Sequence, residues 1–341
     1  MKISIIIPVY NVESYITDCL QSVMRQTYQG RLECIMVDDC GTDKSLAIAE
    51  KLIADYEGSI EFRVLHHEHN RGLSAARNTG MDAARGEYVY FLDSDDWISD
   101  DCVEKLAKPI QNEAFDIVVG DYVTVGKLPY QLELSLPEGS YHEKGISKTF
   151  CNQGVYVMAW NKLYSKEFLN NNRLRFEEGK VHEDEILAFE ISCIDKSFYV
   201  VKSVTYYYRI RENSIVTNND SMKKMAGYLG VLQSVKDRVK RYENIDGIYD
   251  FYMFWIMRVF RWMSRIEMNE ELDIFVQNHI RGFLDTIPNV CFLQNKHNRL
   301  AYFFCKKDQT YSRFQKVTII YANTLQGRVL RNVLGLLPVK H

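Results

Sequence analysis

Long apolar segments, cysteine motifs and sequence repeats are all missing from this chain of 341 residues. No uncharged segment is long enough to cross a bilayer, and the apolar run before Pro8 is too short for a signal peptide. The eight cysteines form no Cys-x-x-Cys pair and have no histidine at zinc spacing. We therefore expect a reduced, cytoplasmic protein and not a disulfide-rich or zinc-bound one.

Glycine-rich phosphate loops are missing as well. No Gly-x-Gly-x-x-Gly follows the first expected strand, and no Gly-x-x-x-x-Gly-Lys-Ser/Thr occurs anywhere. These absences exclude a dinucleotide-binding Rossmann loop and a P-loop. A diphosphate bound by this chain would need a metal ion in place of a glycine-rich loop.

Charge is unevenly distributed along the chain. The net charge is −3, but residues 1–220 hold 23 Lys and Arg against 35 Asp and Glu, whereas residues 221–341 hold 19 against 10. The basic C-terminal part suggests an anionic partner, either membrane phospholipid or nucleic acid. The acidic first part and the lack of a known nucleic-acid-binding module weigh against nucleic acid.

Strand-like and helix-like patterns alternate through the N-terminal part of the chain. Strands are expected at residues 3–7, 33–37, 62–65 and 88–92, and Asn11 is the expected N-cap of the first helix. This alternation predicts an α/β fold with a parallel, doubly wound sheet that helices cover on both faces. Ligands of such sheets bind outside the carboxyl ends of the strands.

The last of these strands runs directly into a cluster of carboxylates. Tyr88 to Leu92 is followed by Asp93, Asp95 and Asp96. Carboxylates this close raise one another's pKa unless a cation lies between them, so the cluster suggests a divalent metal ion. The alternative is a solvated turn that caps the next helix.

Four sequence blocks in this order resemble the family 2 glycosyltransferases, which have the GT-A fold. They are Ile5 to Asn11, Val37 to Ser45, Arg71 to Asn78 and Phe91 to Asp96. The resemblance implies a Rossmann-like, mostly parallel sheet with helices on both faces. It also implies a catalytic domain at residues 1–218, with a nucleotide-sugar half at 1–100 and an acceptor half at 101–218. The resemblance stops there, and the residue patterns beyond it predict a mainly helical, basic C-terminal extension at residues 219–341.

The resemblance implies a nucleobase pocket formed by Pro8, Val9 and Tyr10. Asp38 would accept a hydrogen bond from the base, which suits the N–H of uracil, and Arg71 would lie near the base and phosphates. The alternative for Arg71 is a salt bridge at a helix N-terminus, with Asp39 or Asp43 as its partner.

The acidic cluster would complete the donor site. By the same resemblance, Asp93 and Ser94 would contact the ribose, and Asp95 would bind the Mn²⁺ or Mg²⁺ that bridges the diphosphate. Such a metal offsets the charge of the departing UDP. The expected donor is therefore a UDP-sugar.

A general base is needed for inverting transfer, and the segment from His182 to Glu185 supplies candidates. The resemblance favours Asp184 as the base. Glu183 is the alternative, because a one-residue shift moves the carboxylate around the helix. Carboxylates in a first helical turn also complement the helix dipole without any role in catalysis.

Two further segments are expected near the acceptor and the diphosphate. Trp160 and Lys162 lie in a segment that resembles the one beneath the acceptor in the family, although Lys162 fits a half-buried hairpin equally well. Arg209 lies where the family often places basic residues against the diphosphate. The Gln-x-x-Arg-Trp motif of processive synthases is missing, so we expect transfer of a single sugar.

The C-terminal region offers two helical patterns. Phe251 to Ile266 is rich in aromatic residues, which favours core packing. Val317 to Leu337 has an apolar face and basic residues elsewhere, which fits a helix at an anionic membrane surface or one docked on the protein itself. The first interpretation predicts peripheral attachment at the inner face of the cell membrane.

These patterns together predict metal-dependent, inverting transfer of one sugar to a glycan or lipid-linked acceptor in polysaccharide biosynthesis. Two other functions stay open. A sugar nucleotidyltransferase would need a glycine-rich loop with Arg and Lys near the N-terminus, which this sequence lacks. A non-catalytic nucleotide-sugar-binding module would need no general base.

Overall fold

The computed structural model describes residues 1–126, 134–211, 220–263, 266–267, 269–280, 282–287, 293–295, 298–299 and 302. The chain divides into two compact units. The first consists of residues 1–144, 149–179 and 195–218, and the second of residues 145–148, 180–194 and 219–341. Residues 180–194, which the sequence placed in the acceptor half, thus belong to the second unit. A functional domain boundary at residue 218 stays a prediction.

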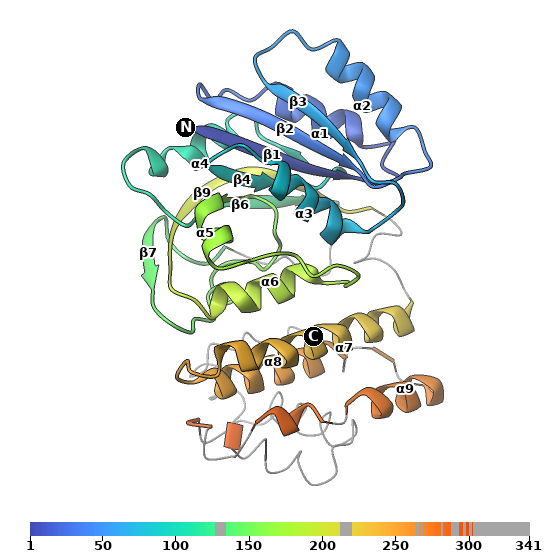
Figure 1. Cartoon of the computed structure of the whole chain (residues 1–341), viewed down its shortest axis with the longest axis vertical. Coiled ribbons are helices and arrows are strands. Elements are labelled where there is room, and N and C mark those ends of the chain that lie inside the picture. Colours follow the sequence, from blue (N-terminus) through green and yellow to red (C-terminus); the bar gives the residue numbers. More distant parts are fainter. Residues whose placement is uncertain are drawn as a thin grey trace. The chain divides into compact units, whose positions relative to one another are not determined.

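A nine-stranded sheet forms the first unit (Figure 1). Its strands run in the order β3-β2-β1-β4-β8-β6-β9-β5, with β7 also paired to β9. Their bounds are β1 Lys2–Val9, β2 Arg31–Asp38, β3 Glu61–His66, β4 Tyr88–Phe91, β5 Trp97–Ile98, β6 Ile117–Val125, β7 Gly139–Glu143, β8 Lys162–Ser165 and β9 Lys196–Arg209.

Most neighbouring strands around β1 run parallel. β1 pairs in parallel with β2 and β4, β2 with β3, and β6 with β9. β8 is antiparallel to both β4 and β6, and β5 and β7 are antiparallel to β9. The predicted GT-A type of sheet is confirmed, with antiparallel strands that the sequence patterns did not reveal.

The helices of the first unit are α1 Ile16–Met24, α2 Ser45–Ala54, α3 Leu73–Ala83, α4 Cys102–Ala107 and α5 Lys166–Asn171, with a short 3₁₀ helix at Pro109–Gln111. α3 packs closely on β1. A Cβ atom at Gly80 would lie 2.3 Å from Cγ2 of Ile6, so this approach requires glycine. Ile6 itself is fully buried, as expected of a central parallel strand covered on both faces.

Asn11 does not cap the first helix, contrary to the prediction. The helix begins later, after Tyr15, and has no side-chain cap. Asn11 instead has a φ of 51° and accepts a hydrogen bond from the backbone N–H of Thr42, with 2.8 Å between the two heavy atoms. It therefore ties the segment after β1 to the segment after β2.

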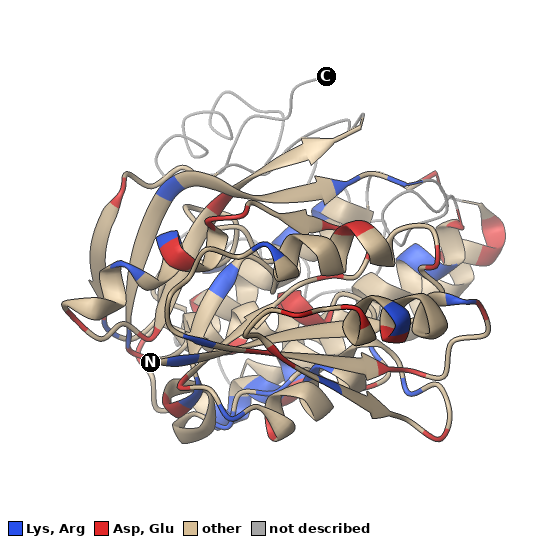
Figure 2. Ribbon diagram, turned by 90° about the horizontal axis from the view of Figure 1, so that it is seen from above, with Lys and Arg blue, Asp and Glu red and all other residues tan. Residues whose placement is uncertain are grey.

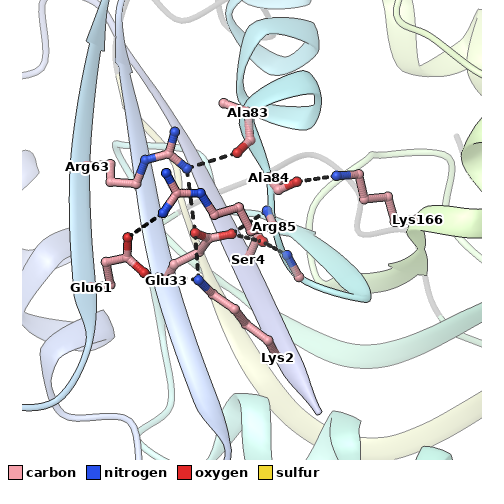
Figure 3. Close-up of polar contacts among 10 residues, drawn as sticks. Lys2, Ser4, Glu33, Glu61, Arg63, Ala83, Ala84, Arg85 and Lys166 are labelled. Carbon is pink, nitrogen blue, oxygen red and sulfur yellow. Dashed lines mark hydrogen bonds and ion pairs between the residues drawn. The ribbon is translucent and has the colours of Figure 1, made fainter.

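The buried carboxylate of Glu33 joins several strands at the edge of the sheet where the parallel strands begin (Figure 3). Glu33 is 0% exposed and accepts hydrogen bonds from Ser4 Oγ at 2.5 Å and from the backbone N–H of Arg85 at 2.6 Å. Lys2 Nζ lies 3.0 Å and Arg63 Nη1 3.6 Å from its Oε2. This network connects β1, β2, β3 and the entry to β4.

Helices make up the described part of the second unit, which confirms the predicted helical C-terminal region. They are α6 Glu183–Ser192, α7 Ser221–Val239, α8 Ile248–Met263 and α9 Glu270–Ile280, with 3₁₀ turns at Lys240–Tyr242 and Leu284–Thr286. The predicted aromatic core is present, because Phe189 of α6 stacks on Phe251 of α8 and meets Trp255 edge to face. The predicted helix from Val317 to Leu337 lies outside the described residues.

The described residues also bear on membrane crossing and on the distribution of charge. None of their helices is long and apolar enough to cross a membrane. Acidic and basic residues are interspersed along the described helices and strands (Figure 2). The excess of basic residues seen in the sequence lies partly at the C-terminus, outside the described residues.

Candidate active site

The carboxyl ends of β1, β2 and β4 meet at one edge of the sheet. β1 lies between the other two, and Val9 is in register with Asp38. Of the three residues predicted at the base pocket, Pro8 and Val9 are buried, whereas Tyr10 is 48% exposed. The Tyr10 ring is therefore available for stacking against a ligand, while Pro8 and Val9 support it by packing.

The carboxylate of Asp38, at the end of β2, has two long contacts. Its Oδ1 lies 3.4 Å from the backbone nitrogen of Gly41, and its Oδ2 lies 3.4 Å from Nδ1 of His66. Both distances exceed those of strong hydrogen bonds. Asp38 can therefore exchange either contact for a hydrogen-bond donor on a ligand.

Asp39, the next residue, is instead buried and strongly held. Its two oxygens accept hydrogen bonds at 2.8 Å from the backbone N–H groups of Arg71 and Gly72. Oδ1 also lies 2.7 Å from Nδ1 of His67, whose other nitrogen is 2.9 Å from Thr79 Oγ1. Asp39 thus fixes the start of α3 beside the end of β2.

The side chain of Arg71 lies at the surface and pairs with Glu178. Its Nη2 is 3.2 and 3.3 Å from the two carboxylate oxygens, and both side chains are 40% or more exposed. The alternative salt bridge to the side chain of Asp39 or Asp43 is not what the structure shows. Such an exposed pair is worth about 1 kcal/mol at most, so a phosphate can displace Glu178.

Asp93 is held by a buried arginine. Nη2 of Arg77 lies 2.7 Å from Asp93 Oδ1, and the guanidinium lies 5.1 Å from the ring centroid of Phe176. Arg77 is 2% exposed, whereas the Asp93 side chain is 23% exposed. The neighbouring Ser94 is buried. Asp93 therefore presents a fixed, partly exposed carboxylate at the sheet edge.

Asp95, the predicted metal ligand, pairs with Arg211. Arg211 Nε lies 2.6 Å from Asp95 Oδ2, and Arg209 Nε donates to the Asp95 carbonyl at 2.9 Å. Burial and the negative charge of Asp93 raise the pKa of Asp95, although Arg211 acts to lower it. A cation beside this carboxylate is therefore electrostatically favoured.

Asp96, in the same cluster, is buried and holds the surrounding structure together through hydrogen bonds. It is 0% exposed, accepts a hydrogen bond from the Tyr206 hydroxyl at 2.6 Å and accepts another from the backbone N–H of Arg209 at 2.7 Å. Burial, with the charges of Asp95 and Asp93, raises its pKa well above the usual range. Asp96 thus links the end of β4 to the end of β9.

The two predicted base residues begin α6 in the second unit. His182 precedes the helix with a φ of 65°, a conformation that residues other than glycine rarely adopt. Glu183 is buried, whereas Asp184 is half-buried and accepts a hydrogen bond from the N–H of Glu185 at 3.1 Å. The exposure of Asp184 favours it over Glu183 as the group that meets an acceptor.

Residues 4–172 match the sequence model of the family described as Glycosyl transferase family 2. The chain belongs to this family.

Several curated relatives of this chain are named as bacterial glycosyltransferases. This chain is 38% identical over 226 residues to glycosyltransferase GlyA of Streptococcus pneumoniae. The aligned residues cover 63% of this chain and 31% of GlyA. This chain is 34% identical over 221 residues to the putative glycosyltransferase EpsH of Bacillus subtilis, with 63% of this chain and 62% of EpsH covered. The chain therefore spans less than two thirds of the length of either relative.

Solved structures show the same fold. The crystal structure of Staphylococcus aureus TarS 1–349 in complex with UDP-GlcNAc matches with a TM-score of 0.73 and 22% identity, covering 94% of this chain and 91% of that one. At this identity the likeness shows the fold alone. The predicted GT-A fold is thereby confirmed.

Trp160 and Lys162 lie in the core and not at a surface. Trp160 is 3% exposed and stacks on Tyr206, with ring centroids 4.4 Å apart. Lys162 is 1% exposed, donates a hydrogen bond to the carbonyl of Met158 and places its ammonium 3.8 Å from the ring centroid of Tyr156. This placement favours the structural alternative for Lys162, because a contact with substrate would require it to leave the core.

Arg209 is held on several sides within the first unit. Besides its bond to the Asp95 carbonyl, its Nη2 lies 2.7 Å from Oδ2 of Asp18. The guanidinium lies 4.6 Å from the ring centroid of Trp97 and 5.2 Å from that of Tyr15. The predicted contact of Arg209 with the diphosphate stays a prediction.

The acidic cluster fits a divalent cation that a diphosphate binds at the same time. Among the described residues no group of three His, Cys, Asp or Glu side chains is arranged to hold a metal ion. Asp96 is used structurally, whereas Asp93 and Asp95 each give one oxygen to an arginine, so these two are the candidate ligands and Asp95 is the one that the sequence predicted. Mg²⁺ and Mn²⁺ commonly take one or two carboxylates and complete their coordination with phosphate oxygens and water.

Sequence reasoning did not assign the residues that position this site. Asp39 and Asp96 lie beside predicted ligands, so the signal was the doubled carboxylate in each block. Arg77 lies inside the third block, but its partner Asp93 could not be inferred from spacing. Glu178 carries no recognisable motif.

Proposed function

We propose that the protein transfers a single sugar, with inversion, from a UDP-sugar to a hydroxyl group of a glycan or lipid-linked acceptor. The observation that carries this proposal is the gathering of Tyr10, Asp38, Asp93 and Asp95 at one sheet edge in a family 2 fold. This edge joins an exposed aromatic ring to carboxylates with different degrees of burial.

The donor would bind across the ends of β1, β2 and β4. The Tyr10 ring would stack on uracil, and Asp38 would accept the N–H of the base in place of its long contacts. Asp93, held by Arg77, would accept hydrogen bonds from the ribose hydroxyls. TarS, whose fold this chain shares, has been solved with UDP-GlcNAc, which supports a uridine nucleotide here.

Asp95 would hold Mn²⁺ or Mg²⁺ against the diphosphate, and the metal would neutralise the charge that develops on departing UDP. Arg71 would contribute a second positive charge once it exchanges Glu178 for phosphate oxygens. Arg209 and Arg211 contact Asp95 at the same edge and would add positive charge beside the diphosphate. These groups favour breakage of the bond between the anomeric carbon and the phosphate oxygen.

Asp184 would act as the general base. The acceptor oxygen forms a bond to the anomeric carbon from the face opposite UDP, its proton passes to Asp184, and UDP leaves with the electron pair of the broken bond. This geometry inverts the anomeric configuration. Glu183 is the second candidate for the base, although its burial makes it less accessible.

The acceptor is proposed from chemistry and relatives together. TarS of Staphylococcus aureus, 31% identical over 212 residues and covering 61% of this chain and 35% of that protein, is named as a poly(ribitol-phosphate) beta-N-acetylglucosaminyltransferase. A polysaccharide or a lipid-linked glycan of the cell surface is therefore the acceptor class that we propose. Cytoplasmic location with peripheral attachment to the inner membrane face fits a lipid-linked acceptor, and flotation of the full-length chain with anionic liposomes tests it.

Titration calorimetry with UDP, with and without Mn²⁺, tests the donor site. The native protein should bind UDP much more tightly with Mn²⁺, and Asp95→Ala should lose this difference while Asp38→Ala weakens binding with and without metal. A panel of UDP-sugars then identifies the donor. Absence of UDP binding under both conditions would contradict the uridine assignment. Binding of UDP-sugars without transfer of the sugar would favour a non-catalytic module.

A further inference from the structure

The first turn of α6 carries three carboxylates in succession, and the proposed base is the middle one. Glu183 and Glu185 are buried on either side of the half-buried Asp184. Like charges this close repel one another, and the positive end of the helix dipole offsets only part of that repulsion. The position of Asp184 therefore depends on what holds the flanking carboxylates.

Arg258 of α8 holds Glu185. Its Nη2 lies 3.0 Å from Oε1 and 3.1 Å from Oε2 of the carboxylate, and the two side chains are 13% and 10% exposed. The guanidinium also lies 4.7 Å from the ring centroid of Trp262 and 5.4 Å from that of Trp255. Charge pairing and ring contacts together fix this arginine in one place.

The charge of Glu185 depends on this contact. Burial raises its pKa to about 7, although the charge of Arg258 acts to lower it and the charge of Asp184 acts to raise it further. Without Arg258, the buried Glu185 would either take up a proton or turn toward solvent. Both outcomes would disturb the neighbouring Asp184.

A chain of ring contacts completes the surroundings of this turn. The His182 ring stacks on Tyr228 of α7 with centroids 5.2 Å apart, and Tyr228 lies 5.4 Å from Trp262 of α8. A Cβ atom at Gly227 would lie 3.2 Å from Cδ2 of His182, so α7 leaves just enough room for the imidazole. The start of α6 is thus held by α7 through His182 and by α8 through Glu185.

We infer that Arg258 is a positioning residue for the general base. By holding Glu185 toward α8, Arg258 sets the rotation of the first turn of α6. Asp184 lies about 100° away from Glu185 around the helix axis, so its carboxylate is directed to a different side of α6. The inference rests on the proposed function of Asp184. Arg258 lies well beyond residues 4–172, the part that the family model matches.

Arg258→Met and a matched variant in α7, Arg238→Met, test this inference. Arg238 pairs with Glu190 of α6, with 3.1 Å between Nε and Oε2, but that pair lies two turns away from Asp184. UDP release from the donor that the UDP-sugar panel selects gives kcat and KM. We expect Arg258→Met to lower kcat about thirtyfold with the KM for donor within about twofold, because a small displacement of a catalytic group is costly. Arg238→Met should lower Tm but leave kcat within about threefold of the native value.

Rescue separates positioning from simple destabilisation. Arg258→Lys keeps the charge but not the two-pronged contact, so its kcat should fall between those of the native protein and Arg258→Met. Adding Glu185→Gln to Arg258→Met removes the unpaired buried charge and should recover part of the lost kcat. If Arg258→Met does not fold, the comparison of Arg258→Lys with Arg238→Lys decides the question.

Two results would overturn the inference. One is an equal loss of kcat in the Arg258 and Arg238 variants at equal loss of Tm, and the other is a loss confined to the KM for donor. Asp184→Asn separates this failure from failure of the proposed function. An inactive Asp184→Asn with a native kcat in Arg258→Met refutes only the role of Arg258, whereas a fully active Asp184→Asn refutes the assignment of the base itself.

Discussion

Nε of Arg211 lies 2.6 Å from Oδ2 of Asp95, so an arginine of this chain occupies the carboxylate that we assign to the metal. Both side chains are partly exposed, at 31% and 20%. A guanidinium and a divalent cation cannot use the same carboxylate oxygen at once. Metal binding to Asp95 therefore has to compete with Arg211 or share the carboxylate with it.

Removal of this competing cation should strengthen metal binding. A partly exposed ion pair is worth about 1 kcal/mol, which corresponds to roughly a fivefold change in affinity. Arg211→Ala should therefore bind Mn²⁺ about fivefold more tightly than the native protein in titration calorimetry at a fixed, saturating UDP concentration. Arg85→Ala, far from Asp95 at the other edge of the sheet, serves as the control, and weaker Mn²⁺ binding by Arg211→Ala would show that Arg211 supports the metal site.

Asp39 and Asp38 should respond differently to the same substitution. Asp39→Ala removes a buried acceptor from the N–H groups of Arg71 and Gly72, so we expect it to lower the free energy of unfolding by about 3 kcal/mol. Asp38→Ala removes only long contacts and should change that free energy by less than about 0.5 kcal/mol while it weakens UDP binding. Urea denaturation and calorimetry measure the two effects, and a strongly destabilised Asp38→Ala would contradict the division of roles.

Lys162 can be assigned to the core or to the substrate by one substitution. Because its ammonium is buried on the Met158 carbonyl and over Tyr156, Lys162→Met should leave UDP affinity within about twofold. The free energy of unfolding should change by about 1 kcal/mol or less, since the apolar side chain replaces a buried charge of similar shape. Lys166→Met, which removes a similar contact to the Ala84 carbonyl, is the matched control. A loss of UDP binding at unchanged stability would show that Lys162 contacts the ligand, contrary to this assignment.

The part of the sheet around β1 could be predicted from the sequence because β1, β2 and β4 each contain an apolar run. Residues 3–7 and 33–37 were expected as strands and lie within β1 and β2. β5, β7 and β8 have only two to five residues each, and runs so short carry no periodic signal. The carboxylates at the strand ends were predicted as a group for the same reason, since each follows an apolar run.

The partners of those carboxylates could not be predicted in the same way. Asp39 meets Arg71 across 32 residues, and Glu185 meets Arg258 across 73. Such pairs depend on how distant elements pack, and no local pattern reports that. Sequence therefore indicates which acidic groups gather at the edge, whereas only the structure distinguishes an anchor such as Asp39 from an available ligand such as Asp38.

Acid stability should depend on Glu33 at the amino-end edge of the sheet. Burial acts to raise its pKa, but hydrogen bonds from Ser4, the Arg85 N–H and Lys2 outweigh burial and lower the pKa below its ordinary value of 4.5. A carboxyl group with a lowered pKa in the folded state stabilises the protein above its unfolded-state pKa. That contribution is lost as the pH falls through the folded-state pKa.

Glu33→Gln should therefore lower the free energy of unfolding by about 2 kcal/mol at pH 7 and by progressively less below pH 4.5. Urea denaturation at a series of pH values measures the difference between the two proteins. Glu61→Gln is the control, because its carboxylate pairs with Lys2 and Arg85 at the surface and is 46% exposed, so its effect should stay under about 0.5 kcal/mol at every pH. A difference between Glu33→Gln and the native protein that did not shrink on acidification would mean that Glu33 stabilises the sheet through its shape and not through its charge.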